Sequence, residues 1–167
     1  MPHTPSGPSY EICPSCGFQF GVSDDDQGYE YEQWREMWLS LDRAISGDAH
    51  AATTLRGVEH DALRRVAAAL GEPLTVTKQA ATRVVQSLID GTASPTEVQT
   101  WASLMRRGYA AESTPGPIRP IDVEFEEPWE DEISTVISRL DELGDLVDGS
   151  LTSTESRRLL ALLGAAD

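Results

Sequence analysis

Several common features are missing from this chain of 167 residues, and each absence narrows its class. With only two cysteines, the chain cannot be held together by a set of disulfides. No apolar run approaches the roughly 20 residues that a membrane-spanning helix needs, so we expect no membrane association. The N-terminus has no basic segment followed by an apolar one, so no signal peptide is predicted and a cytoplasmic location is the default expectation.

Recognisable catalytic residue sets are also missing. No Ser/His/Asp or Cys/His arrangement, phosphate-binding loop or isolated carboxylate pair stands out. Asp90-Gly91 followed by Glu97 matches the second half of an EF-hand loop. However, Gln86 and Leu88 occupy positions where a calcium loop needs Asp or Asn. We therefore expect a protein that is not an enzyme and that has no calcium site.

Negative charge, in contrast, is abundant and unevenly distributed. The net charge is −15, of which residues 1–50 carry −7, residues 51–112 carry +1 and residues 113–167 carry −9. Such a field repels nucleic acid and anionic membranes, and it speeds the encounter with a basic protein. Solubility alone is the alternative explanation, but the clustering of the acids at both ends favours a basic protein partner.

Cys13 and Cys16 form the most informative motif. Two thiolates two residues apart on a tight turn can both bind one tetrahedral Zn²⁺, and Pro14 and Gly17 suit such a turn. This is half of a closed site, so zinc would be shared between two chains of a homodimer or completed by histidine or carboxylate. The three histidines lack ligand-like spacing to the pair and are expected to be solvent-exposed. A metal-free knuckle held by its aromatic neighbours and a redox dithiol remain open as alternatives.

The hydrophobic spacing predicts a mainly α-helical chain with a small N-terminal module. Residues 1–9 are predicted to be a flexible tail, and residues 10–45 a Cys-knuckle or β-hairpin followed by a helix from about Glu30 to Leu41. The small, polar stretch from Ser46 to Thr54 is predicted to be a linker or loop. Residues 55–167 are predicted to form a helical domain.

Local capping signals place five helices in that domain. They run from about Glu59 to Leu70, from Thr77 to Asp90, from the capping box at Ser94 to Gly108, from Pro128 to Gly144, and from the capping box at Thr152 onward. Between them, Ile121, Val123 and Phe125 alternate with acids, which predicts a short extended segment. The segment 88–97 matches the segment 146–155, because each contains a glycine stop, a short turn and a helix cap.

Seven acids occur among the eleven residues from Asp122 to Glu132. Acids suit the positive end of a helix dipole, which accounts for the acids after Pro128 but not for those before it. The alternative is an acidic and aromatic contact surface, with Phe125 and Trp129 as candidate anchors for a basic protein. Together with an acidic turn, the predicted partner-binding residues are Asp24, Asp25, Asp26, Glu124, Phe125, Glu126, Glu127, Trp129, Glu130 and Asp131.

Two segments resemble families of small bacterial proteins. Residues 10–21, with Tyr31, Trp34, Arg35 and Trp38 after them, resemble a Cys-Pro-x-Cys-Gly-x-x-Phe-Gly module. Many proteins with this module are thought to be immunity proteins of toxin systems, although Ser15 stands where the module often has another cysteine. Residues 88–102 resemble a second, helical family that is partly immunity-like. The resemblance covers about half of the chain and implies a non-enzymatic bacterial protein, but it implies little about the target. Together with the clustered negative charge and the lack of a catalytic residue set, it makes a toxin-neutralising immunity protein or a similar inhibitor our leading expectation.

Overall fold

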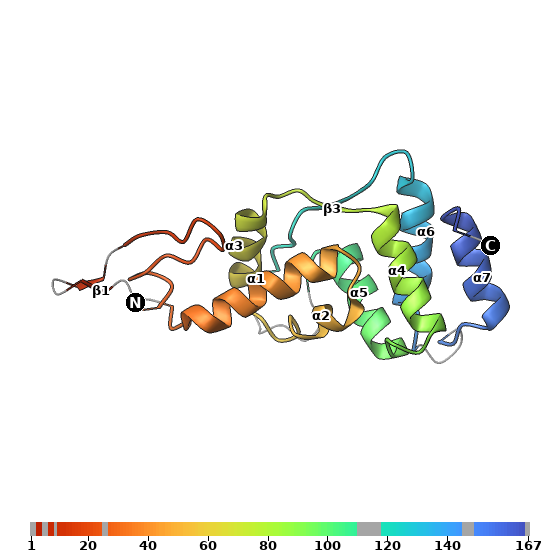
Figure 1. The fold of residues 1–167 in the computed structure, drawn as a ribbon, viewed down its shortest axis with the longest axis horizontal. Helices are drawn as coiled ribbons and strands as arrows, with labels where there is room; N and C mark the ends of the chain where they lie inside the picture. Colours follow the sequence, from red (N-terminus) through yellow and green to blue (C-terminus); the bar gives the residue numbers. More distant parts are fainter. Residues whose placement is uncertain are drawn as a thin grey trace.

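Helices dominate the computed structural model, which describes residues 3–4, 7–8, 10–24, 27–109, 118–144 and 149–165. The mainly α-helical class is confirmed. The helices are α1 (Tyr31–Ile45), α2 (Ala49–Thr53), α3 (His60–Leu70), α4 (Lys78–Ile89), α5 (Pro95–Arg107), α6 (Glu130–Asp141) and α7 (Ser153–Leu162). The molecule is elongated, with the N-terminal residues at one end and α7 at the other (Figure 1). Within the described residues, no helix is long and apolar enough to cross a membrane.

The predicted caps at Thr77 and Ser94 form as expected, because they depend on residues that are close in sequence. At Thr152 only half of the predicted capping box forms, since Glu155 N donates to the hydroxyl while Glu155 Oε1 accepts from Arg139. The Thr77 hydroxyl accepts a hydrogen bond from Ala80 N at 3.1 Å and begins α4. At the start of α5, the Ser94 hydroxyl and the Glu97 carboxylate each accept a hydrogen bond from the other residue's backbone N–H. Gly71 ends α3 with a φ of 101°, a left-handed conformation that favours glycine.

The predicted linker between Ser46 and Thr54 was wrong, because this stretch contains helix α2. Asp48 caps α2 by accepting a hydrogen bond from Ala51 N at 3.2 Å. Three alanines of α2 are buried, and the helix packs against α1 and α5. Small side chains suggested flexibility in the sequence, whereas in the fold they allow these helices to approach closely.

A short parallel sheet joins two segments that are far apart in the chain. β3 (Leu74–Val76) pairs with β4 (Val123–Phe125) in the register Leu74–Val123, Thr75–Glu124 and Val76–Phe125. The extended segment at β4 was predicted, but β3 was not. Near the N-terminus, β1 (His3–Thr4) pairs antiparallel with β2 (Gly7–Pro8). The other residues of the predicted flexible tail lie outside the described residues.

Gly108 connects α5 to the chain that leads into β4. It has a φ of 70° and ends α5, and its carbonyl accepts a hydrogen bond from Ile121 N at 2.7 Å. A Cβ atom at this position would collide with the backbone of Ile121, so a side chain here would push the segment away. The close approach therefore sets where β4 starts.

One continuous hydrophobic core runs through the molecule from Cys16 to Leu163. Trp34 and Trp101 are its largest fully buried side chains. The indole Nε1 of Trp101 donates to Ala44 O at 2.7 Å and so links α5 to the end of α1. Trp34 Nε1 donates to Cys16 O at 2.7 Å and links the N-terminal residues to α1.

Candidate acidic docking site

A hollow of about 540 Å³ lies along β4 and the start of α6. Five of the predicted partner-binding residues line it, together with two residues of the sheet. We call it the acidic groove; its lining residues are Thr75, Val123, Glu124, Phe125, Glu126, Glu127 and Glu130.

The register of the parallel sheet decides which side chains face the groove. Thr75 pairs with Glu124, and both side chains are exposed, so they lie on the outer face of the sheet. Val123 and Phe125 alternate with them and are half-buried beside the core. After β4, Trp129 N donates to Glu126 O at 2.8 Å, and this turn carries the chain into α6.

Glu126 has a structural role within the groove. Its Oε2 accepts a hydrogen bond from Lys78 N at 2.7 Å, at the first residue of α4. Its backbone N–H also bonds to Val76 O at 3.1 Å, which closes the end of the sheet. The carboxylates of Glu124, Glu127 and Glu130 are instead exposed. Three of the four glutamates are therefore available at the surface.

Trp129 lies next to the groove but is engaged within the protein. Its ring is half-buried, and the ammonium nitrogen of Lys78, the only lysine of the chain, lies 3.8 Å from the ring centroid. At this distance the cation and the ring attract each other. Trp129 is not among the lining residues of the groove, and neither is Asp131, which is exposed on α6.

Asp24, the described aspartate of the acidic turn near the N-terminus, does not line the groove. Asp24 Oδ1 accepts a hydrogen bond from Gly21 N, so this carboxylate helps to shape its own turn. The turn belongs to the N-terminal end of the molecule, whereas β4 lies toward the opposite end (Figure 1). Asp25 and Asp26 lie outside the described residues.

Cys13 and Cys16 share one turn but differ in environment. Cys13 N donates to Phe18 O at 2.7 Å, and Gly17 N donates to Cys13 O at 2.9 Å. A backbone hydrogen bond from Cys16 is the main cause that lowers the pKa of the Cys13 thiol to about 7. Cys16 is only 2% exposed, and burial raises the pKa of its thiol. Both thiols are free rather than disulfide-bonded.

The described residues do not bring further ligands to the cysteine pair. Within these ranges there is no group of three or more His, Cys, Asp or Glu side chains that could hold one metal ion. His50 is exposed, as predicted, and its Nδ1 lies 2.7 Å from Glu97 Oε1. His60 was predicted to be exposed, but it is 8% exposed and its ring packs edge-on against Tyr109. The side chain of His3 is outside the described residues.

Sequence reasoning missed a buried carboxylate between α5 and α6. Asp141 Oδ2 lies 2.9 Å from Arg106 Nη1 and 3.2 Å from Arg107 Nη2, and only 3% of its side chain is exposed. Both arginines lie in the last turn of α5. Their partner lies on another helix, so no local signal could have identified it. The arrangement ties α5 to α6.

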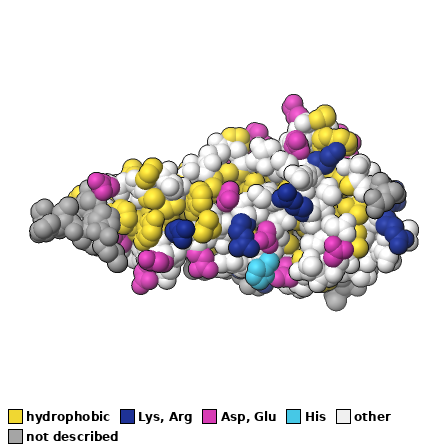
Figure 2. Space-filling model, in the orientation of Figure 1, with side chains coloured by type: hydrophobic (Ala, Val, Ile, Leu, Met, Phe, Trp, Pro, Cys, Tyr) yellow, Lys and Arg dark blue, Asp and Glu magenta, His cyan; other side chains and the backbone are white. Residues whose placement is uncertain are grey.

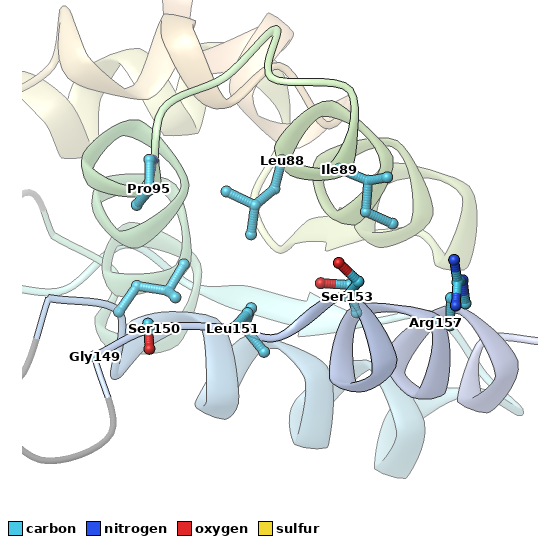
Figure 3. A pocket seen from close by; sticks show the side chains of 10 residues that line it. Leu88, Ile89, Pro95, Gly149, Ser150, Leu151, Ser153 and Arg157 are labelled. Carbon is cyan, nitrogen blue, oxygen red and sulfur yellow. The ribbon is translucent and has the colours of Figure 1, made fainter.

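A second cavity, of about 370 Å³, lies between the segment 88–97 and residues 149–155, which belong to the segment that matches it in sequence (Figure 3). The ends of α4 and the starts of α5 and α7 form it. Its lining residues are Leu88, Ile89, Pro95, Leu143, Gly149, Ser150, Leu151, Ser153, Ser156 and Arg157. The lining is aliphatic with a few hydroxyls and one guanidinium, and it contains neither a carboxylate nor a nucleophile paired with a base.

Comparison of the chain with protein-family models, with curated proteins and with solved structures gave no match. Of the surfaces described above, the acidic groove combines exposed glutamates, a half-buried phenylalanine and a strand.

Proposed function

We propose that this protein is a non-enzymatic acidic binding protein that neutralises a basic partner, in the manner of a toxin-inhibiting immunity protein. The acidic groove carries this proposal. Glu124, Glu127 and Glu130 are exposed around it, and Phe125 is half-buried in its wall. Clustered carboxylates steer and orient a cationic surface, while apolar area at the centre supplies contact energy.

The placement of the groove supports this role. The chain between β4 and α6 projects from the surface, at the upper right of Figure 2, and acidic and hydrophobic side chains lie side by side there. A projecting surface is accessible to a large partner. The net charge of −15 adds a long-range attraction for any basic protein.

The three exposed glutamates are also free to contact the cations of a partner. Among the described residues, none of Glu124, Glu127 and Glu130 forms an ion pair. Elsewhere several acids are paired, such as Asp48 with Arg43 at 2.6 Å. A contact surface made of unpaired carboxylates gains most from a partner that brings cations.

The test is affinity capture of the tagged protein from its host lysate, with elution by a salt gradient and identification by mass spectrometry. We expect a stoichiometric basic protein that elutes at raised salt. A variant with Glu124→Lys, Glu127→Lys and Glu130→Lys should lose it. The matched control is Glu32→Lys, Glu36→Lys and Asp42→Lys on α1, which changes the net charge equally at three exposed positions.

The possible outcomes distinguish binding at the acidic groove from binding that depends only on the net charge. Loss of the partner from the groove variant alone supports docking at the groove. Equal loss from both variants would assign the binding to net charge, and retention by both would contradict docking at the groove. Recovery of the protein without any basic partner would contradict the proposed function itself.

A zinc-bridged homodimer that acts as a scaffold or regulator is the second candidate. It is supported by the two free thiols on one turn and by the low pKa of Cys13, since zinc binds thiolates. The burial of Cys16 requires this turn to open before thiolates of a second chain can share the metal. We expect one zinc ion for each pair of chains, and dissociation on chelation or in Cys13→Ser. A dimer unaffected by both treatments would exclude this candidate.

A further inference from the structure

The bonding pattern of β4 directs part of its backbone away from β3. Leu74 N donates to Asp122 O at 2.9 Å, and Glu126 N donates to Val76 O at 3.1 Å. In a parallel pair, alternate residues of a strand bond to the neighbour. With this register, Glu124 bonds to β3, while the backbone N–H and C=O groups of Val123 and Phe125 point to the opposite edge.

That edge of β4 is open in the described part of the chain. Within residues 10–24, 27–109, 118–144 and 149–165, no group outside the sheet forms a hydrogen bond with the backbone of Val123 or Phe125. Both residues are partly exposed and line the acidic groove. Helix α1 packs against β3, and α6, which follows β4 in the chain, packs against β4. An open edge is a template for an added strand.

The charges beside this edge select the added strand. Glu124 projects from the outer face of β4, and Glu127 and Glu130 lie at its end. A second copy of the chain would bring the same glutamates against them, and like charges opposite each other across paired strands are destabilising. An acidic segment is rejected for the same reason, whereas a segment with lysine or arginine at alternate positions is attracted.

We propose that the basic partner adds an extended strand to the free edge of β4. This inference rests on the proposed function and specifies how the acidic groove is occupied. The added strand exchanges hydrogen bonds with the backbone of Val123 and Phe125. Its alternate side chains lie on the two faces of the extended sheet, so cationic ones meet Glu124 while apolar ones contact Phe125.

The first test uses two synthetic peptides of equal length and charge. One alternates lysine and valine, and the other is the same peptide with every backbone nitrogen methylated, so that it has no backbone N–H on either edge and cannot extend a sheet. Titration at low salt should show the unmodified lysine–valine peptide binding at least about tenfold more tightly, because the hydrogen bonds that it donates to the edge of β4 are lost with the other. Amide exchange at Val123 and Phe125 should slow in the complex, with little change at Glu124.

A protein variant provides an independent test. Val123→Pro removes one N–H from the free edge and none from the pairing with β3, so the fold should survive while the preference for the unmodified lysine–valine peptide falls. Circular dichroism verifies the fold. Should the variant unfold, the exchange experiment on the unmodified protein still decides the proposal.

The remaining outcomes are separable from those of the affinity capture. Equal binding of both peptides would overturn strand addition and leave the proposed function intact, because charge alone would then hold the partner. No binding of either peptide would mean that the glutamates only shield the edge from pairing. Slowed exchange at Val123 with rising protein concentration and no peptide would assign the edge to a second copy of the chain.

Discussion

The two fully buried tryptophans stabilise two regions of the molecule by the same kind of hydrogen bond, from the indole N–H to a backbone carbonyl oxygen. Trp34 donates to Cys16 O and Trp101 donates to Ala44 O, both at 2.7 Å. Around Trp101, α1, α2 and α5 pack into the helical body. Trp34 instead holds residues 10–24, the N-terminal segment, whose described backbone has one isolated bridge, between Ile12 and Gln19, and no helix. The same kind of hydrogen bond thus lies within the packed helices at Trp101, whereas at Trp34 it attaches the N-terminal segment to α1.

The largest effect is expected for Trp101→Ala. It removes a side chain that is 0% exposed and leaves a cavity among three helices, which should lower the free energy of unfolding by about 4 kcal/mol. Thermal unfolding followed by circular dichroism would measure it. A loss below about 1 kcal/mol would show that the helical body does not depend on this side chain.

Trp34→Ala should destabilise the protein less, by about 3 kcal/mol, because part of the loss is confined to the N-terminal segment. The distinguishing measurement is the alkylation of Cys16, which should become much faster when its cover is lost. If Cys16 stayed as protected as in the unmodified protein, or if both alanine variants lost equal stability and unfolded as one unit, the two regions would not differ as described.

The phenylalanine variants isolate the hydrogen bonds. Trp34→Phe and Trp101→Phe retain an aromatic ring but remove the indole donor. Cys16 O then loses its bond from Trp34, whereas Ala44 O still accepts from Gly47 N at 3.0 Å. Trp34→Phe should therefore cost about 1 to 2 kcal/mol through the lost hydrogen bond, and the corresponding loss at Trp101→Phe should be smaller. Urea titration of both variants would compare them, and a much larger loss at Trp101 would mean that ring volume rather than the hydrogen bond dominates there.

The two regions should also respond to pH in different ranges. In the N-terminal segment, the pKa of Cys13 is about 7, below its ordinary value of 9.0, and that of Cys16 is raised. The contribution of Cys13 to stability is complete above about pH 9 and disappears as pH falls through 7, whereas that of Cys16 acts in the opposite sense. Alkylation rates resolved by mass spectrometry should therefore rise near pH 7 at Cys13 and only at higher pH at Cys16. If the alkylation rates of Cys13 and Cys16 rose over the same pH range, the two thiols would not differ in environment as described.

In the helical body, the pH range in which stability changes lies at acidic pH. The hydrogen bond with His50, followed by those from Ser94, lowers the pKa of Glu97 from 4.5 to about 2. A lowered carboxyl pKa contributes stability above about pH 4.5 that is lost as pH falls toward 2. Glu97→Gln should remove this part of the acid dependence, measured as the difference in unfolding midpoint between the two proteins. An unchanged acid profile would show that the hydrogen bonds at Glu97 contribute little.

The features that sequence predicted well are those that depend on neighbours in the chain. The helix caps at Thr77 and Ser94 and the stop at Gly71 follow from side chains within four positions, so their chemistry is visible in the sequence. β3 was missed because three residues carry no period and become a strand only by pairing with β4. The role of Asp141 was missed for the same kind of reason, since both of its arginines lie on another helix.

The candidate site divides in the same way. Glu124, Phe125, Glu127 and Glu130 are close in sequence and line the groove together, whereas Thr75 reaches it only by pairing with Glu124 in the sheet. The prediction could not separate Glu126, which binds the backbone of α4, from its exposed neighbours. Charge and spacing therefore grouped these residues in the sequence, and tertiary contacts decided which of their side chains are exposed.

The parallel pairing of β3 with β4 has a consequence for the order of folding. Two complete helices, α4 and α5, lie between these strands in the chain. The strands cannot meet until that long loop has been closed, and closing it before the helices have docked carries a large entropic penalty. The sheet should thus be among the last elements to form. A ligand that recognises its edge would bind only molecules that have finished folding, and nascent or damaged chains would be ignored.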